Sequence, residues 1–396
     1  MAKCLHGSIL VIITILAIFG NASTPMDQFT PKCEVGTGIY KPAELEALPW
    51  FNVNLDLPPR ERYKHVVAPL GLEMQAVINT LKQMAGILGP LPMEIIETLM
   101  TGAYESRFPL TYREEIEGIA EASGVAVADL AMMNIFYELS RFCTSIIADN
   151  DKNEIFHVRN LDFGQLMVWN ITSQSWQLTD CLKKASVNLN FLRNGKVIFK
   201  GTTMAGHVGL ITAMKPGQFS LSMNSRLVPD IANVAAWLMG DLNDVHFSMW
   251  IEREVMENAK DYGEAIQQLS TLPQLTGTYY IVGGAHVGQG CLLVKNDSWV
   301  DATVQLDESS RINGWYVLQT NYDPDKEPLF LDDRRTPGNV CMKKLGKSNV
   351  SLAGLYEVLT SRPTLNKTTV QTVLASVTTG HYVSYAAYCP NPCWAF

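Results

Sequence analysis

The pattern of apolar and polar positions changes character between residues 142 and 143. Before this point apolar residues recur at helical spacing, most clearly over 72–88, where Gly89-Pro90 ends the pattern. Thr111 and Glu114 are spaced as a capping box for a helix that ends near Gly124, and 126–140 reads as another helix. The first third of the chain is therefore predicted to be mainly helical.

After residue 142 the pattern is typical of strands and hairpins, interrupted by a few helical stretches. Arg193-Asn194-Gly195 is a strong tight-turn signal between two such runs. Strands are predicted at 143–148, 154–161, 187–192, 196–199, 208–214, 218–223, 279–282, 291–294 and 315–320. Helices are predicted at 231–239, 250–269 and 352–360. This order indicates a layered α/β body with largely antiparallel sheets.

The N-terminus resembles a secretory signal peptide. Lys3 precedes an apolar run at 9–19, and small residues allow cleavage after Ala22. That run is too short to span a bilayer, so the mature protein is predicted to be soluble and to begin after residue 22. Four sequons fit a secreted glycoprotein, at Asn170, Asn296, Asn349 and Asn366. The net charge of −8 argues against a nucleic-acid binder.

Seven cysteines remain once the signal segment and Cys4 are removed. An odd number in an oxidising compartment leaves at least one thiol outside intramolecular disulfides. Cys389-Pro-Asn-Pro-Cys393 is a candidate for a tight local bridge, and spacing alone leaves the other pairings open. No metal-ligand spacing is present, and the histidines are scattered.

Cys143 opens a predicted strand and is the strongest candidate for chemistry. Turn residues at 149–153 predict a hairpin in which Ala148 pairs with Glu154, and this register places Cys143 opposite Arg159. Asp162 follows three residues later. A guanidinium and a carboxylate beside a thiol favour a positioned nucleophile. The alternative is that Cys143 is simply a small core hydrophobe.

Several motifs are spread over nearly the whole chain. They are Trp50-Phe-Asn-Val-Asn-Leu-Asp-Leu-Pro-Pro59, Asn134-Ile-Phe-Tyr-Glu-Leu139, Cys143-Thr-Ser145, Arg159-Asn-Leu-Asp-Phe-Gly164, Gln319-Thr-Asn-Tyr-Asp323 and Leu331-Asp-Asp-Arg-Arg-Thr-Pro337. With these motifs the chain resembles the acid ceramidase family, which belongs to the N-terminal nucleophile amidohydrolases, with N-acylethanolamine acid amidase and the choloylglycine hydrolases. The resemblance implies an αββα sandwich preceded by a helical α fragment.

It also implies that the precursor cuts itself between Phe142 and Cys143. The products would be an α fragment, 23–142, and a β fragment, 143–396, which stay together as a disulfide-linked heterodimer. The new α-amine of Cys143, with a reference pKa of about 8, would serve as the base.

Within this implied site, Arg159 and Asp162 would position Cys143, and Asn321 would donate to the oxyanion. Arg334 would lie in the site. The alternative role for Arg334 is a structural ion pair with Asp332 or Asp333.

The resemblance further implies two disulfides, Cys33–Cys341 and Cys389–Cys393. A third bridge, Cys181–Cys291, would leave Cys143 as the single unpaired thiol.

The implied substrate is an N-acylated lipid, most simply ceramide, hydrolysed without a cofactor in the lysosomal lumen or after secretion. A lipid-transfer activator protein and transient contact with a membrane surface are the implied partners. Two alternatives remain. One is the same chemistry on N-acylethanolamines, and the other is a secreted lipid-binding homologue with weak catalysis.

Two departures from the family pattern bear on this reading. Ser225 stands where the relatives carry a glutamate after the asparagine. Arg141 lies two residues before Cys143, where an apolar run is usual, and invites cutting by another protease.

Overall fold

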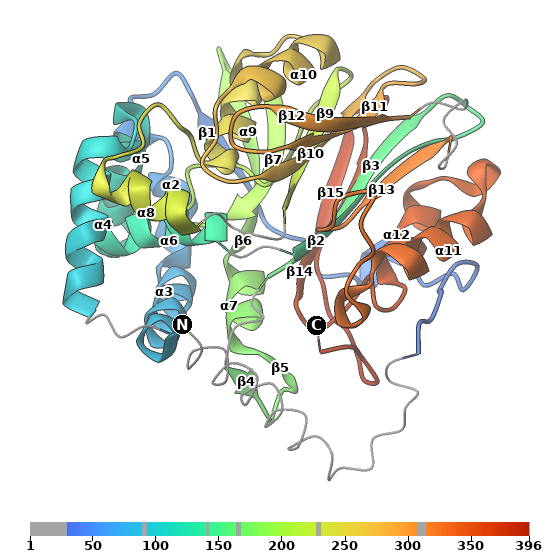
Figure 1. Cartoon of the computed structure of the whole chain (residues 1–396), viewed down its shortest axis with the longest axis horizontal. Coiled ribbons are helices and arrows are strands. Elements are labelled where there is room, and N and C mark those ends of the chain that lie inside the picture. Colours follow the sequence, from blue (N-terminus) through green and yellow to red (C-terminus); the bar gives the residue numbers. More distant parts are fainter. Residues whose placement is uncertain are drawn as a thin grey trace.

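A computed structural model describes residues 30–88, 93–139, 142–163, 168–226, 231–306 and 314–395. The predicted signal segment and Arg141 lie outside these ranges. Two sheets face each other at the centre of the molecule, and helices cover their outer faces (Figure 1). This is the αββα sandwich that the family resemblance implies.

The larger sheet has the order β1-β6-β7-β8-β9-β10-β11-β12. Its strands are β1 (Trp50–Asn54), β6 (Ser186–Arg193), β7 (Lys196–Met204), β8 (Thr212–Lys215), β9 (Phe219–Ser225), β10 (Thr278–Gly284), β11 (Gly290–Lys295) and β12 (Val300–Gln305). Its outer face carries α9 (Ser248–Asn258) and α10 (Tyr262–Thr271). Among the described strand pairs, only β1–β6 is parallel.

The smaller sheet has the order β13-β2-β3-β14-β15. Its strands are β13 (Tyr316–Gln319), β2 (Phe142–Asp149), β3 (Ile155–Asp162), β14 (Thr369–Ser376) and β15 (His381–Ala386). Helices α11 (Arg335–Leu345) and α12 (Leu352–Thr360) cover its outer face. Apolar side chains such as Ile147, Ile281 and Val373 fill much of the space between the sheets.

Residues before Phe142 form most of a helical cluster at one side of the sandwich (Figure 1). Its main helices are α3 (Gly71–Leu88), α4 (Met93–Arg107), α5 (Leu110–Ser123) and α6 (Val127–Leu139), and α8 (Ile231–Met239) packs on α4. Shorter elements are η2 (Pro42–Glu44), η3 (Pro59–Glu61), α2 (Lys64–Val67), η4 (Ala68–Leu70), η5 (Phe330–Asp332), η6 (Lys347–Asn349), β4 (Trp169–Asn170), β5 (Ser175–Trp176) and α7 (Gln177–Ala185).

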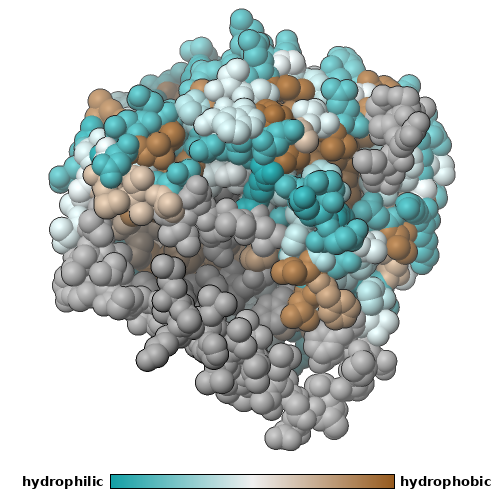
Figure 2. Space-filling model, viewed as in Figure 1, coloured by the Kyte–Doolittle hydropathy of each residue, from teal (hydrophilic) through white to brown (hydrophobic). Residues whose placement is uncertain are grey.

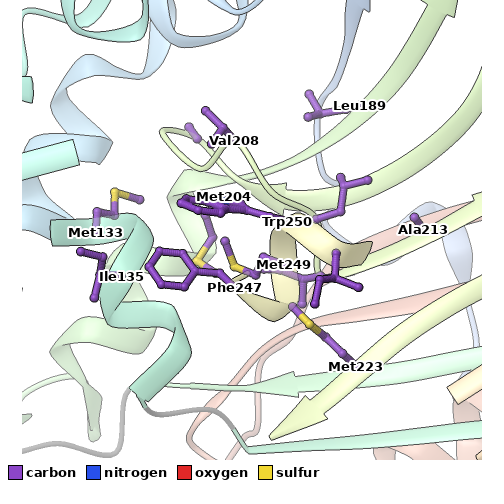
Figure 3. Close-up of a cluster of buried hydrophobic side chains, with 14 of the residues drawn as sticks. Met133, Ile135, Leu189, Met204, Val208, Ala213, Met223, Phe247, Met249 and Trp250 are labelled. Atoms are coloured by element: carbon purple, nitrogen blue, oxygen red, sulfur yellow. The ribbon is translucent and has the colours of Figure 1, made fainter. Parts of the chain in front are cut away.

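A buried apolar cluster joins this helical part to the larger sheet. In Figure 3, Met133 and Ile135 of α6 lie beside Met204, Phe247 and Met249. All five side chains are buried and belong to one core. Burial of apolar surface therefore stabilises the contact between the segments on either side of Cys143.

Most predicted elements are present, with three corrections. Helix α5 begins at Leu110 after Pro109, and no side chain caps it, so the predicted capping box is wrong. The predicted helix at 250–269 is two helices, because Asp261 accepts a hydrogen bond from the N–H of Glu264 and starts α10 anew. The strand predicted at 208–214 is restricted to β8.

Candidate active site

Cys143 is the second residue of β2 and is fully buried. It pairs with Leu161 of β3, while Phe142 pairs with Asp162 and Ser145 with Arg159. The predicted register, with Arg159 opposite Cys143, is therefore wrong by two residues.

The turn explains this difference. Asn150 Oδ1 accepts hydrogen bonds from the N–H groups of Lys152 and Glu154, and Asn153 adopts a left-handed conformation with φ of 62°. The loop has the expected length but lies one residue further along the chain, at 150–154, because Asp149 pairs with Ile155, and this moves the register by two residues.

Arg159 nevertheless reaches the thiol. Its position lies diagonally across the two strands on the same face as Cys143, within the reach of a long side chain. Nη2 of Arg159 donates to Cys143 Sγ, and Nη1 donates to Thr212 Oγ1 at 2.8 Å and to the Ile211 carbonyl. The buried guanidinium is held in place by the start of β8 and faces the sulfur.

Asp162 is also fully buried, at the end of β3 opposite Phe142. Its Oδ2 accepts a hydrogen bond from Arg334 Nη1 at 2.8 Å. Burial raises the pKa of Asp162 to about 6, although the neighbouring Arg334 opposes this shift. The carboxyl thus titrates in the mildly acidic range, next to the bond before Cys143.

Arg334 combines the two roles that the sequence left open. It forms ion pairs with Asp162 and with Asp332, and it is 1% exposed. It also donates to the Cys143 carbonyl and to Asn321 Oδ1, both at 2.8 Å. Asp333 instead accepts from the N–H of Thr336 at the start of α11. Arg334 therefore ties the nucleophile, the carboxylate and Asn321 together.

Asn321 contacts the nucleophile through its oxygen in this uncut chain. Oδ1 accepts from the N–H of Cys143 at 2.8 Å, and Nδ2 donates to the Ser225 carbonyl at 2.7 Å. The partners fix the orientation of the amide, since Arg334 and the Cys143 N–H can only donate. The structure thus brings together all five predicted catalytic residues, Cys143, Arg159, Asp162, Asn321 and Arg334.

Sequence reasoning missed the partners that come from β9 and from the loop after β13. The Ser225 carbonyl accepts a hydrogen bond from Asn321, whereas the Ser225 hydroxyl donates to the Arg226 carbonyl at 3.4 Å. A pocket of about 390 Å³ opens beside Asn321, lined also by Tyr279 and by the ion pair of Arg226 with Asp323. The Ser225–Asn321 and Arg226–Asp323 contacts join residues 96 and 97 positions apart, so no local pattern could reveal them.

Both disulfides implied by the family are present, Cys33–Cys341 and Cys389–Cys393. The suggested Cys181–Cys291 bridge is wrong. Cys181 lies beside Thr80 at 3.8 Å, Cys291 lies in β11 beside Tyr262, and both remain thiols, as does Cys143. The Cys33–Cys341 bond links the segments on either side of the predicted cut.

The four sequons differ in accessibility. Asn170 and Asn349 are exposed, and Asn296 is half-buried. Asn366 is 1% exposed, and its amide oxygen accepts from the N–H of Thr368. A glycan at Asn366 is incompatible with this packing. Glycosylation at Asn170, Asn296 and Asn349 stays a prediction.

The described part of the chain contains no group of three or more metal-ligating side chains. The groups that surround Cys143 are the Arg159 and Arg334 guanidinium groups, the Asp162 carboxylate and the Asn321 amide. Among the described residues, no helix combines the length and the apolar character that crossing a bilayer requires.

Comparison with known proteins places this geometry in a family. Residues 143–288 match the model of linear amide C–N hydrolases of the choloylglycine hydrolase family, and the match begins at Cys143. Residues 46–104 match the model described as the beta subunit of N-acylethanolamine-hydrolyzing acid amidase.

Full-length relatives agree. A probable acid ceramidase of Caenorhabditis elegans is 47% identical over 395 residues, covering 98% of both chains. Human acid ceramidase is 38% identical over 351 residues, covering 88% of both chains. Among solved structures, the Caenorhabditis elegans ortholog of N-acylethanolamine-hydrolyzing acid amidase matches with a TM-score of 0.53 and 27% identity. This match covers 62% of this chain and 100% of that one.

Proposed function

Since this chain belongs to the acid ceramidase family, we propose that it hydrolyses the amide bond of ceramide to a fatty acid and a sphingoid base. One observation carries the proposal. The buried Cys143 thiol faces Arg159 at the point where the amide-hydrolase family match begins, and Asn321 and Arg334 hold the Cys143 backbone. Thiol, donors and carboxylate are the parts that acyl transfer needs.

The proposed maturation step is self-cleavage before Cys143. The thiol attacks the Phe142 carbonyl, the peptide nitrogen leaves as the α-amine of Cys143, and water then hydrolyses the thioester to free the Phe142 carboxylate. Because Phe142 pairs with Asp162, the new amine would form beside that carboxyl. Asn321 Oδ1, which already accepts from the Cys143 nitrogen, would orient the amine.

In the mature enzyme the same atoms would act on the lipid amide. The α-amine, with a reference pKa of about 8, takes the thiol proton as sulfur attacks the carbonyl carbon and passes it to the departing sphingoid amine. Water then releases the fatty acid from the thioester. The side-chain amide nitrogen of Asn321 carries two hydrogens. One is donated to the Ser225 carbonyl, and we propose that the other is donated to the oxyanion of the tetrahedral intermediate.

Several features support a lipid substrate and a disulfide-linked pair of fragments, 23–142 and 143–396. Cys33–Cys341 would hold the fragments together after the cut. Three exposed apolar residues, Leu329, Phe330 and Leu331, directly precede Asp332 in the sequence. They offer an apolar surface for lipid next to the site. Figure 2 shows separate apolar patches among hydrophilic residues on one face. We assign the protein to the lysosomal lumen or the secreted fraction, with a lipid-transfer activator as its partner.

The alternative substrate class is the N-acylethanolamines, which the amidase named in one matching family model and in the solved neighbour hydrolyses. Turnover of both lipids should be compared at acidic pH, with Cys143→Ala as the control. We expect a higher kcat/KM for ceramide, and none for the variant. A higher kcat/KM for the N-acylethanolamine would favour the alternative.

Intact mass tests the maturation step separately. After reduction of Cys33–Cys341, we expect the parent to give two fragments with Cys143 as a new N-terminus, and the Cys143→Ala variant to stay whole. A variant that is still cut would show that another protease acts at Arg141-Phe142. A parent that stays whole and turns over neither lipid would favour a lipid-binding homologue.

A further inference from the structure

A layer of polar side chains is buried between the two sheets below the site. It consists of Ser145 of β2, His157 of β3, and Ser220, Ser222 and Asn224 of β9, none of which is more than 2% exposed. Much of the surrounding space between the sheets is apolar. Burying polar groups there costs free energy unless each one is hydrogen-bonded, so their bonding pattern is informative.

The pattern can be followed from Asn224. Its Nδ2 donates to the carbonyls of Gln319 at 2.9 Å and Thr320 at 3.1 Å. These two bonds take both amide hydrogens and fix the direction of the carboxamide, because a carbonyl can only accept. Oδ1 must therefore accept, and it receives the Ser145 hydroxyl at 2.8 Å.

The fixed orientation of Asn224 determines the direction of each further hydrogen bond in the series. Because Ser145 donates its one hydroxyl hydrogen to Asn224, its Oγ accepts from the Ser222 hydroxyl at 3.0 Å. Ser222 in turn must accept from His157 Nε2 at 2.8 Å. The other ring nitrogen, Nδ1, is then left to accept from Ser220 at 2.7 Å, since it lies much closer to that hydroxyl than the other acceptor, the Gly283 carbonyl at 3.4 Å. Burial lowers the pKa of His157 to about 3, which agrees with a neutral ring carrying its hydrogen on Nε2.

The chain ends on the segment that carries Asn321. Asn224 holds the carbonyls of the two residues before Asn321, and the Asn321 amide holds the carbonyl of Ser225, the residue after Asn224. The ends of β9 and β13 are thus joined by hydrogen bonds in both directions, since each end donates from a side-chain amide to backbone carbonyls of the other. Ser145 lies two residues after Cys143, and His157 lies two residues before Arg159.

We propose that His157, Ser222, Ser145 and Asn224 are positioning residues for Asn321. Two backbone carbonyls set the direction of this chain of hydrogen bonds at Asn224, and the chain, whose other end is the Nε2–H form of His157, holds the Asn321 carboxamide against Cys143. The inference rests on the proposed function, in which Asn321 stabilises the oxyanion. A small displacement of such a donor can cost up to about a hundredfold in rate, so residues behind it matter for turnover.

A matched set of serine variants tests the proposal in the processed enzyme. Ser222 and Ser220 are both buried serines of β9 that contact His157, but only Ser222 lies between the ring and Asn224. We expect Ser222→Ala to lower kcat about tenfold with KM nearly unchanged. Ser222→Thr, which keeps the hydroxyl, should restore most of the loss, and Ser220→Ala should stay within about twofold of the parent.

Two results would overturn the proposal. One is an equal effect of Ser222→Ala and Ser220→Ala on kcat, which would mean that the layer serves packing alone. The other comes from ¹⁵N NMR of the imidazole, in which a hydrogen on Nδ1 at about pH 5 to 7 would contradict the direction of the chain. An inactive parent would overturn the proposed function, while the NMR measurement would still decide this inference.

Discussion

A buried ion pair across the predicted cut should hold the two fragments together even without their disulfide. Arg253 of α9 donates from Nη2 to Glu115 of α5 at 2.7 Å, and Nη1 makes a second bond to the same carboxylate. The side chains are 1% and 0% exposed. Arg253 also donates to the Val208 carbonyl, and its guanidinium carbon lies 5.1 Å from the ring centre of Tyr112. The perturbation that we choose is Arg253→Met.

The expected magnitude follows from what each partner retains. Removing one member of a buried pair usually costs about 3–5 kcal/mol, because the other charge stays buried without compensation. In the variant, Glu115 still has its ion pair with Arg62, at 3.0 Å, and methionine fills part of the space of the arginine side chain. We therefore expect a loss of unfolding free energy at the lower end of this range, about 3 kcal/mol. With a denaturant slope of about 3 kcal/mol per molar urea, the midpoint falls by about 1 M.

The assay is a urea titration of the processed protein after reduction of Cys33–Cys341, followed by size-exclusion chromatography. We expect the reduced parent fragments to elute together without urea, and the Arg253→Met fragments to separate at about 1 M less urea than the parent. Arg60→Met is the matched control, because Arg60 pairs with Glu117 and Glu121 at the surface, within one fragment. The control should behave as the parent. Equal midpoints for Arg253→Met and the parent would refute the reasoning, as would parent fragments that part on reduction alone.

Three further predictions concern the site. Asn321→Ala should lower turnover by roughly a hundredfold with little change in folding; a variant that is equally active but less stable would return Asn321 to a structural role. Burial lifts the pKa of Asp162 from the usual 3.8 to about 6, so the stability from its protonated form is present below pH 3.8 and lost as the pH rises through 6. In an uncut Cys143→Ala background, Asp162→Asn should flatten this part of the curve of unfolding free energy against pH, and an unchanged curve would contradict the assignment. Ser225→Glu should speed the appearance of the fragment that begins at Cys143, with a pH dependence absent from the parent, in a time course of intact mass. Equal rates at every pH would sink that idea.

Elements with a clear period could be predicted from the sequence. The helix at 231–239 and the Asn194-Gly195 turn are present where the pattern indicated, with positive φ at both turn residues. Strand β14 was missed because it is buried on both faces, so its polar residues do not alternate with apolar ones. Helices α9 and α10 were merged because a helical apolar spacing runs across the break at Asp261.

The site was predictable as a set of residues but not as a geometry. Motif resemblance selected Cys143 and its four neighbours, and the hairpin brought Arg159 close to the thiol even with the register in error. A two-residue slip keeps each side chain on the same face of the sheet, whereas a slip of one residue would have turned Arg159 away. The acceptor role of Asn321 Oδ1 depends on Arg334, 13 residues away and beyond any local pattern.

Ser225 shows how a departure from a family pattern can be limited in its effect. The contact that this position makes with Asn321 uses its backbone carbonyl, which any residue supplies. A serine in place of glutamate therefore leaves the hydrogen bonds between the ends of β9 and β13 intact. What serine cannot supply is a charge that titrates in the acidic range. The departure therefore bears on the pH dependence of cutting and turnover rather than on the position of Asn321. For this reason the Ser225→Glu variant is informative through its pH profile, and a change in rate that is the same at every pH would point to packing instead.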